Sequence, residues 1–122
     1  MPRMMSFALT TDQVRDRTKT LTRRLGWRHL KAGDRLTAVT KAQGLKKGEH
    51  PEVLAQIEVV SVRREPLCAI TAEEIVREGF GEQFADLHHP VQFIAFFCRT
   101  HQCEPSAEVA RIEFRYLDEV AP

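Results

Sequence analysis

The stretch Lys19-Thr20-Leu21-Thr22-Arg23-Arg24 places an amine, two hydroxyl groups and two guanidinium groups within six residues. Its β-branched alternation predicts a strand over residues 20–25. A strand in a protein core has no need of so many polar groups. The stretch therefore predicts either a functional site or a solvated edge strand.

The same stretch lies in the most basic part of the chain. Residues 15–31 hold seven Lys or Arg and one acid, a net charge of +6, whereas the whole chain carries +1. A positive patch on a nearly neutral protein favours an anionic partner over general adhesion to nucleic acid. Trp27, the only tryptophan, lies in this segment. Its ring is suited to stacking on a nucleobase, and a core position at a strand end is the alternative.

Length and composition indicate one domain over residues 1–122. A chain of 122 residues with 43% hydrophobic and 29% charged residues can bury a core without cross-links. The longest apolar run, residues 91–98, is too short to span a bilayer, and the first residues are too polar for a secretory signal. We therefore expect a cytoplasmic protein that makes no use of membranes. Its three cysteines are expected to be reduced thiols.

Three segments carry signals for the start of a helix. They are residues 10–17 and 71–79, with capping boxes at Thr10/Gln13 and Thr71/Glu74, and residues 90–100, which begin at Pro90. In the third helix, Val91, Ile94 and Phe97/Cys98 form the expected buried stripe.

Four segments alternate as strands do, and they are residues 20–25, 35–43, 53–63 and 109–117. The middle two are expected to form a hairpin with a long loop. Strands and helices do not alternate regularly, which favours an α+β fold. Short strands around a small core suggest a compact barrel with flanking helices.

A cluster of sulfur and imidazole groups raises the question of a zinc site. It comprises Cys98, His101 and Cys103, with His88 and His89 upstream. The spacing does not match the usual pairs of zinc ligands, and Cys98 falls on the expected buried stripe, where cysteine behaves as a small apolar residue. The sequence therefore predicts no metal and no other cofactor.

Lys19 is the candidate general base, provided that its pKa is lowered. Arg23 and Arg24 would lower it by like charge, and an adjacent Glu78 would oppose them. A neutral amine can activate a hydroxyl nucleophile such as Thr22. Residues three apart on a regular strand face opposite sides, so we predict a bend at Lys19–Thr20 that lets the two side chains converge. The alternative is that Lys19 and Arg23 are solvated residues that protect an edge strand.

Glu78 falls in the last turn of the helix predicted over residues 71–79. A carboxylate there meets the negative end of the helix dipole, at a cost of roughly 0.3–1 kcal/mol. A cation from the Lys19/Arg24 group would remove this cost. Glu78 is therefore either an acid held against a site lysine or a solvated residue at a frayed helix end.

Together these residues resemble the ASCH domains, relatives of the PUA RNA-binding fold, and within them the ASCH proteins of phages and prophages. The matching segments are residues 19–24, 30–36, 77–80 and 111–114, and the resemblance covers nearly the whole chain. The signature Gly-x-Lys-x-x-x-x-Arg of the family is matched by Lys19 and Arg24. Arg17 stands at the position of its glycine, which bears on the conformation of the loop before Lys19.

The resemblance implies a PUA-like, small mixed β-barrel of about six strands with flanking helices and a cleft at the signature. One implied function is that of a small amidohydrolase, which removes an acyl group from the exocyclic amine of acylated cytidine nucleosides. The other is an RNA- or nucleotide-binding module, including a metal-independent ribonuclease, that uses the same cleft.

In the amidohydrolases of this family the catalytic groups are a lysine, a threonine and a glutamate, which correspond to Lys19, Thr22 and Glu78. The residues expected to contact the substrate are Thr20, Arg23, Arg24 and Trp27. The implied partner is a nucleoside or single-stranded RNA, and no obligate protein partner is expected.

Overall fold

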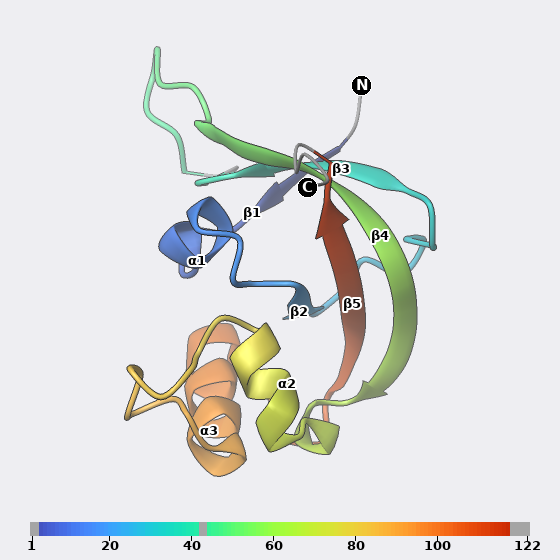
Figure 1. Ribbon diagram of the computed structural model, residues 1–122, viewed down its shortest axis with the longest axis vertical. Helices are drawn as coiled ribbons and strands as arrows, with labels where there is room; N and C mark the ends of the chain where they lie inside the picture. The colour runs from blue at the N-terminus through green and yellow to red at the C-terminus, as the bar shows by residue number, and fades with distance from the viewer. Residues whose placement is uncertain (1–2, 42–43, 118–122) are drawn as a thin grey trace, which may run out of the picture.

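A curled sheet of five strands is the centre of the computed structural model, which describes residues 3–41 and 44–117 (Figure 1). The strands are β1 (Arg3–Ser6), β2 (Leu21–Arg24), β3 (Arg35–Val39), β4 (Val53–Pro66) and β5 (Glu108–Tyr116). They lie in the order β1-β3-β4-β5-β2, and the β1–β3 pair is parallel, whereas the other pairs are antiparallel. Because β1 and β2 end the order without pairing with each other, the sheet is a half-barrel. The expected α+β class is confirmed, with an open sheet of five strands in place of a barrel of about six.

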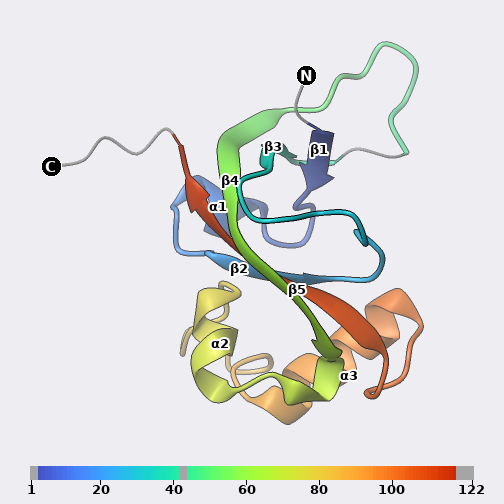
Figure 2. The same cartoon turned by 90° about the vertical axis from the view of Figure 1, so that its right-hand side faces the viewer.

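The helices are α1 (Thr11–Arg15), α2 (Ala72–Arg77), α3 (Pro90–His101) and a short 3-10 turn, η1 (Leu67–Ala69). Figure 2 shows α2 and α3 together at one end of the long strands β4 and β5, with β1 and β3 at the other end. Within the described ranges, no helix has both the length and the apolar character needed to cross a bilayer.

The predicted helix starts meet two different outcomes. The capping box of α2 is confirmed, because the Glu74 N–H donates to Thr71 Oγ1 over 3.3 Å and the Thr71 N–H donates to Glu74 Oε1 over 3.1 Å. The prediction of a capping box at Thr10 is wrong, since no side chain caps α1 there. Gln13 is buried, and its side chain packs against the backbone at Gly79, so it is not available to reach back to Thr10.

The buried face of α3 differs from the predicted stripe. Phe97 is buried as predicted and Phe93 is buried as well, whereas Val91 is 79% exposed. The ring of Phe93 lies 5.9 Å from that of Phe80, which follows α2, and Ile94 only packs against the edge of this cluster. Aromatic packing between the two helices therefore sets the rotation of α3, and the aliphatic residue at its start remains in solvent.

The strand bounds also move. The hairpin of β3 and β4 is confirmed, but β3 ends at Val39, and residues 42–43 of the predicted strand lie outside the described residues. β4 runs to Pro66, beyond the predicted end at residue 63. β1 was not predicted, because four residues are too few to establish an alternating pattern.

Strand β5 divides the core into two clusters. Successive side chains of a strand point to opposite faces. Ile112, Phe114 and Tyr116 join the cluster formed with β1, β3 and β4, whereas Val109 joins the cluster formed with α2 and α3. Arg111 shares the face of Val109, so the alternation that the sequence predicted for this strand turns a guanidinium toward α2.

Gly79, directly after the C-terminal cap of α2, packs against Gln13 of α1. Its φ is +105°, and an added Cβ would lie 2.8 Å from Gln13 Cγ and 2.9 Å from Gln13 Cβ. Gly79→Ala is therefore expected to lower the free energy of unfolding through both left-handed strain, about 1–2 kcal/mol, and overpacking, about 1–3 kcal/mol. Urea unfolding measures the sum.

Gly33→Ala is the matched control for Gly79→Ala. Gly33 also has a positive φ, +92°, but an added Cβ there would meet nothing within 4 Å. Only the backbone strain is expected in this variant. Equal losses in the two variants would show that the contact between Gly79 and Gln13 does not hold α1 against α2.

Candidate active site

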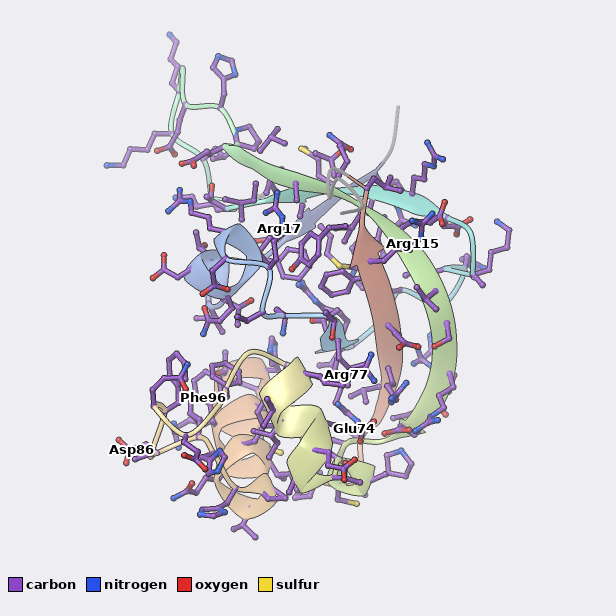
Figure 3. All side chains as sticks on the ribbon, in the orientation of Figure 1. Arg17, Glu74, Arg77, Asp86, Phe96 and Arg115 are labelled. Atoms are coloured by element: carbon purple, nitrogen blue, oxygen red, sulfur yellow. The ribbon has the colours of Figure 1, made fainter. Side chains whose placement is uncertain are left out.

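A pocket of about 210 Å³ lies where residues 6–10, β2, the end of α2 and α3 meet. One side of it is polar and is formed by Lys19, Thr22, Arg23, Arg24 and Glu78. The other side is largely aromatic and is formed by Phe80, Phe93, Phe96 and Phe97, with His101 at the end of α3. Phe96, which Figure 3 labels, is itself a residue of α3. The three predicted catalytic residues thus line one pocket, whereas its aromatic side was not predicted. An apolar pocket with a few convergent polar groups is the usual form of a small-molecule site.

An irregular segment between α1 and β2 brings Lys19 and Thr22 to this pocket. The backbone N–H of Lys19 donates to Gln13 O over 3.2 Å, and that of Thr20 donates to Arg77 O over 2.8 Å. The hydroxyl group of Tyr116 donates to the carbonyl oxygen of Lys19. Lys19 therefore stands before the strand, outside regular secondary structure, and both Lys19 and Thr22 line the pocket. The bend expected at Lys19–Thr20 stays a prediction.

Arg17 takes a conformation that favours glycine. Its φ is +66°, in the left-handed region. The side chain is held as well, because Nη1 lies 2.9 Å from Val14 O and the guanidinium lies 4.8 Å from the centre of the Tyr116 ring. The residue two positions before Lys19 is thus left-handed although it is an arginine.

Lys19 and Glu78 form a buried pair. The Nζ atom of Lys19 lies 2.7 Å from the backbone oxygen of Glu78 and 3.1 Å from its Oε1, and both side chains are 3% exposed. Burial lowers the pKa of Lys19, Glu78 opposes this, and the charges of Arg24 and Arg23 lower the pKa further. The interpretation of either residue as a solvated surface group is wrong.

Arg23 is buried among carboxylates. Its side chain has no exposed surface, with Nη1 2.9 Å from Glu78 Oε2 and Nη2 2.9 Å from Glu74 Oε1 and 3.0 Å from Glu65 Oε2. Arg23 was predicted to contact the substrate. The structure places it in the wall of the pocket with its charge directed at the protein, and its Nε has no hydrogen-bond partner in the described part of the chain.

Arg24 holds the hydroxyl group of Thr22. Its Nε donates to Thr22 Oγ1 over 3.2 Å, its Nη2 donates to Ser6 O over 2.6 Å, and its guanidinium lies 4.7 Å from the centre of the Phe7 ring. Burial lowers the pKa of Arg24 to about 10, and Glu78 opposes this, so the guanidinium remains charged near neutral pH. Because Thr22 Oγ1 accepts from Arg24, its own proton is left for an acceptor in the pocket.

Two of the predicted substrate contacts lie outside the pocket lining. The hydroxyl group of Thr20 accepts from Arg77 Nε over 3.3 Å. Trp27 packs against the cluster formed with β1, β3 and β4, and the guanidinium of Arg3 lies 4.4 Å from the centre of its ring. Trp27 is therefore only partly buried, short of the core position that was the alternative, and base stacking stays a prediction.

The sulfur atoms considered for zinc lie side by side at the end of α3. The Sγ atoms of Cys98 and Cys103 are 4.0 Å apart. Over residues 3–41 and 44–117, the structure brings together no group of three or more His, Cys, Asp or Glu residues suited to a metal ion.

The curled mixed sheet with its helices has counterparts among solved structures, and one of them is an ASCH domain. The chain is similar to the crystal structure of a protein from Enterococcus faecalis assigned to the family model DUF984, with a TM-score of 0.63 and 18% identity over 96% of this chain and 80% of that one. It is also similar to the ASCH domain from Lactobacillus crispatus, with a TM-score of 0.58 and 14% identity over 93% of this chain and 78% of that one. No family model matches the sequence, and no curated protein matches it. The likeness at this level of identity establishes the fold.

Glu74 links the site to the stability of the protein. Burial acts to raise its pKa, but the hydrogen bond from Arg111 and the charge of Arg23 outweigh it and lower the pKa to about 2, from 4.5. A carboxyl group whose pKa is lower in the folded state stabilises that state at pH values above its pKa in the unfolded chain. This stabilisation is lost as the pH falls toward the pKa of the folded state. We therefore expect a loss of roughly 3 kcal/mol in the free energy of unfolding as the pH falls from 5 to 2, measured by urea unfolding.

Glu74→Gln is expected to be less stable at pH 7, by about 3–5 kcal/mol, because it leaves Arg23 and Arg111 with an uncompensated buried charge. It should also reduce the dependence of stability on pH in the acid range. Glu73→Gln, at an exposed position in the same turn of α2, is the matched control and should change neither. An unchanged pH dependence in Glu74→Gln would contradict the assignment to Glu74.

Proposed function

We propose that the protein is an amidohydrolase that removes the acyl group from the exocyclic amine of acylated cytidine nucleosides. The observation that carries the proposal is the buried pair of Lys19 and Glu78, with 3.1 Å between Nζ and Oε1, in a pocket that Thr22 also lines. The three residue types match the catalytic lysine, threonine and glutamate of the amidohydrolases that the sequence resembles. A buried amine with a lowered pKa is suited to proton abstraction near neutral pH.

The chemistry that we propose begins at Thr22. Its Oγ attacks the acyl carbonyl carbon while Nζ of Lys19 accepts the hydroxyl proton. The C–N bond to the nucleoside then breaks, and the proton held between Lys19 and Glu78 passes to the departing amine, which gives cytidine and an acyl ester of Thr22. Water hydrolyses the ester to the carboxylic acid. The guanidinium of Arg24, which donates to Thr22 Oγ1, stabilises negative charge on that oxygen before it attacks.

The division of the pocket also supports this assignment. The polar side presents the candidate base and nucleophile, and the aromatic side around Phe93, Phe96 and Phe97 offers an apolar surface to a planar base or an acyl group. Such a surface excludes water from the reacting amide, which strengthens the electrostatic interactions there.

The test is chromatography of N(4)-acetylcytidine incubated with the protein. Cytidine is expected with the parent protein, and Lys19→Ala should lower the rate about 10²–10⁴-fold, the usual contribution of a general base. Lys31→Ala is the matched control, because Lys31 is an exposed lysine outside the pocket lining, and it should retain the parent rate. Absence of cytidine at high protein concentration would refute this substrate.

Mass spectrometry of the protein during the same reaction decides how Thr22 acts. If Thr22 is the nucleophile, rapid quenching followed by mass spectrometry should detect an acylated protein, which Thr22→Val cannot form. Thr22→Ser keeps a hydroxyl group and should retain part of the activity. Turnover without any acyl adduct would instead mean that Thr22 positions a water molecule for direct attack.

A second candidate function is RNA or nucleotide binding, and one observation favours it. A separate surface hollow of about 490 Å³ is lined by four cations, namely Arg28, Lys31, Arg63 and Arg64. Acidic neighbours pair with them, for example Glu108 with Arg64 at 2.8 Å, which weakens the positive potential of the hollow. Phosphate groups of a single strand are the anions that such a surface would bind.

Binding of a short single-stranded RNA at increasing salt concentration tests this candidate. If the hollow binds phosphates, affinity should fall steeply with salt, and Arg28→Ala with Lys31→Ala should reduce the slope of log K against log salt by about 1–2. Hydrolysis of the neutral nucleoside by the same double variant should be unchanged. Binding that does not depend on salt would refute a phosphate contact at this hollow.

A further inference from the structure

We propose that Arg23 is a positioning residue that acts through Glu78 to hold Lys19 as an uncharged amine, ready to accept a proton. The inference rests on the proposed function, in which Lys19 is the base. The carboxylate of Glu78 lies between the two cationic side chains, with Oε2 2.9 Å from Arg23 Nη1 and Oε1 3.1 Å from Lys19 Nζ. Arg23 thus reaches Lys19 only through the group that they share.

The hydrogen bonds of Lys19 match those of a neutral amine. An ammonium group carries three protons, whereas a neutral amine carries two protons and one lone pair. Nζ has two acceptors, the backbone oxygen of Glu78 at 2.7 Å and Oε1 of Glu78 at 3.1 Å. Both protons of a neutral amine are therefore used, and the lone pair is left for a donor in the pocket.

The balance of buried charge leads to the same state. Three carboxylates lie among three guanidinium groups. The carboxylates are those of Glu65, Glu74 and Glu78, and the guanidinium groups are those of Arg23, Arg24 and Arg111. These six charges cancel, so a protonated Lys19 would add an uncompensated positive charge. Arg63 also contacts Glu65, at 2.7 Å, but its side chain is 61% exposed, and solvent screens its charge.

The groups around Lys19 push its protonation in opposite directions. Those that act on its amine are Glu78 at the end of α2 and Arg23 and Arg24 on β2. Tyr116 on β5 donates to the backbone oxygen of Lys19, and His101 on α3 lines the same pocket. Glu78 alone among them favours the ammonium form. Because Arg23 engages one oxygen of this carboxylate, it limits the attraction that Glu78 exerts on a proton at Nζ and adds its own repulsion.

Arg23 is itself held by two carboxylates that lie outside the pocket lining. Its Nη2 contacts Glu74 and Glu65, and Glu74 is held in turn by the capping box of α2 and by Arg111. The guanidinium therefore presents Nη1 to Glu78 in one orientation. This is how a residue without exposed surface can set the protonation of Lys19.

Nuclear magnetic resonance of selectively ¹³Cε-labelled lysine tests the inference without any need for activity. The chain has five lysines, and the other four, Lys31, Lys41, Lys46 and Lys47, are exposed. In the parent protein the Lys19 signal, assigned with Lys19→Met, should titrate at lower pH than the other four. In Arg23→Gln it should titrate at higher pH than in the parent, since Glu78 then faces Lys19 alone.

Two further variants separate positioning from a general loss of structure. Arg23→Lys keeps the charge but lacks the planar fork with which the guanidinium meets three carboxylates, so a smaller shift in the same direction is expected. This variant serves if Arg23→Gln does not fold. Arg111→Gln removes a guanidinium that contacts Glu74 and not Glu78, so the Lys19 titration should move to higher pH by less than in Arg23→Gln.

Activity on N(4)-acetylcytidine supplies a second readout. The acid limb of the pH–rate profile should move to higher pH in Arg23→Gln. At pH values on the acid limb, the rate should fall about tenfold for each pH unit of the move. At pH values above the shifted limb, the rate should return to that of the parent. A uniform loss at every pH would indicate a structural role only.

The outcomes distinguish this inference from the proposed function. Titration of Lys19 together with the four exposed lysines in the parent, or an equal shift in Arg23→Gln and Arg111→Gln, would overturn the role of Arg23. Absence of cytidine from the parent would overturn the proposed reaction, and the lysine titration would still decide whether Arg23 controls Lys19.

Discussion

The burial of one guanidinium group, that of Arg23, is the constraint on which the rest of the site depends. A charge without solvent contact must be met by opposite charge and by hydrogen bonds, or the folded state loses several kcal/mol. Glu65 at the end of β4 and two carboxylates from α2 and its C-terminal cap, Glu74 and Glu78, meet it. These three contacts tie α2 and its C-terminal cap to strands β2 and β4.

The position of α2 explains why a glutamate can stand at a helix end that disfavours it. The last carbonyl groups of a helix and a carboxylate beside them are both acceptors of negative character. Lys19 donates to the backbone oxygen and to the side chain of Glu78, so one amine compensates both. The turn at Gly79 then brings Phe80 against Phe93 and begins the aromatic side of the pocket. The polar and aromatic sides are therefore consequences of one docking arrangement.

Local signals in the sequence predicted much of the fold, and long-range pairing explains most of what they missed. The capping box at Thr71 and the hairpin of β3 and β4 depend on neighbouring residues, so they could be predicted. The partners of Arg23 lie 42, 51 and 55 residues further along the chain, and no spacing rule distinguishes a buried arginine with such partners from a solvated one. Convergence of Lys19, Thr22 and Glu78 followed from the resemblance to ASCH domains rather than from spacing. The aromatic side was missed because the rotation of α3 is set by contacts with Phe80, outside that helix.

Costs to stability gather around Lys19, and they bear on what the pocket is for. Arg17, two residues earlier, holds a left-handed φ of +66°, Lys19 is desolvated with a lowered pKa, and Nε of Arg23 is buried without a partner in the described part of the chain. Strain and desolvation persist where the surrounding structure imposes them, and they concentrate at functional sites. A pocket that only binds an anion gains most from a lysine that is charged and accessible, because attraction to phosphate depends on the charge. The buried and discharged state inferred for Lys19 sacrifices that attraction. The same state is what proton abstraction from a hydroxyl group requires, which favours hydrolysis over binding as the use of this pocket.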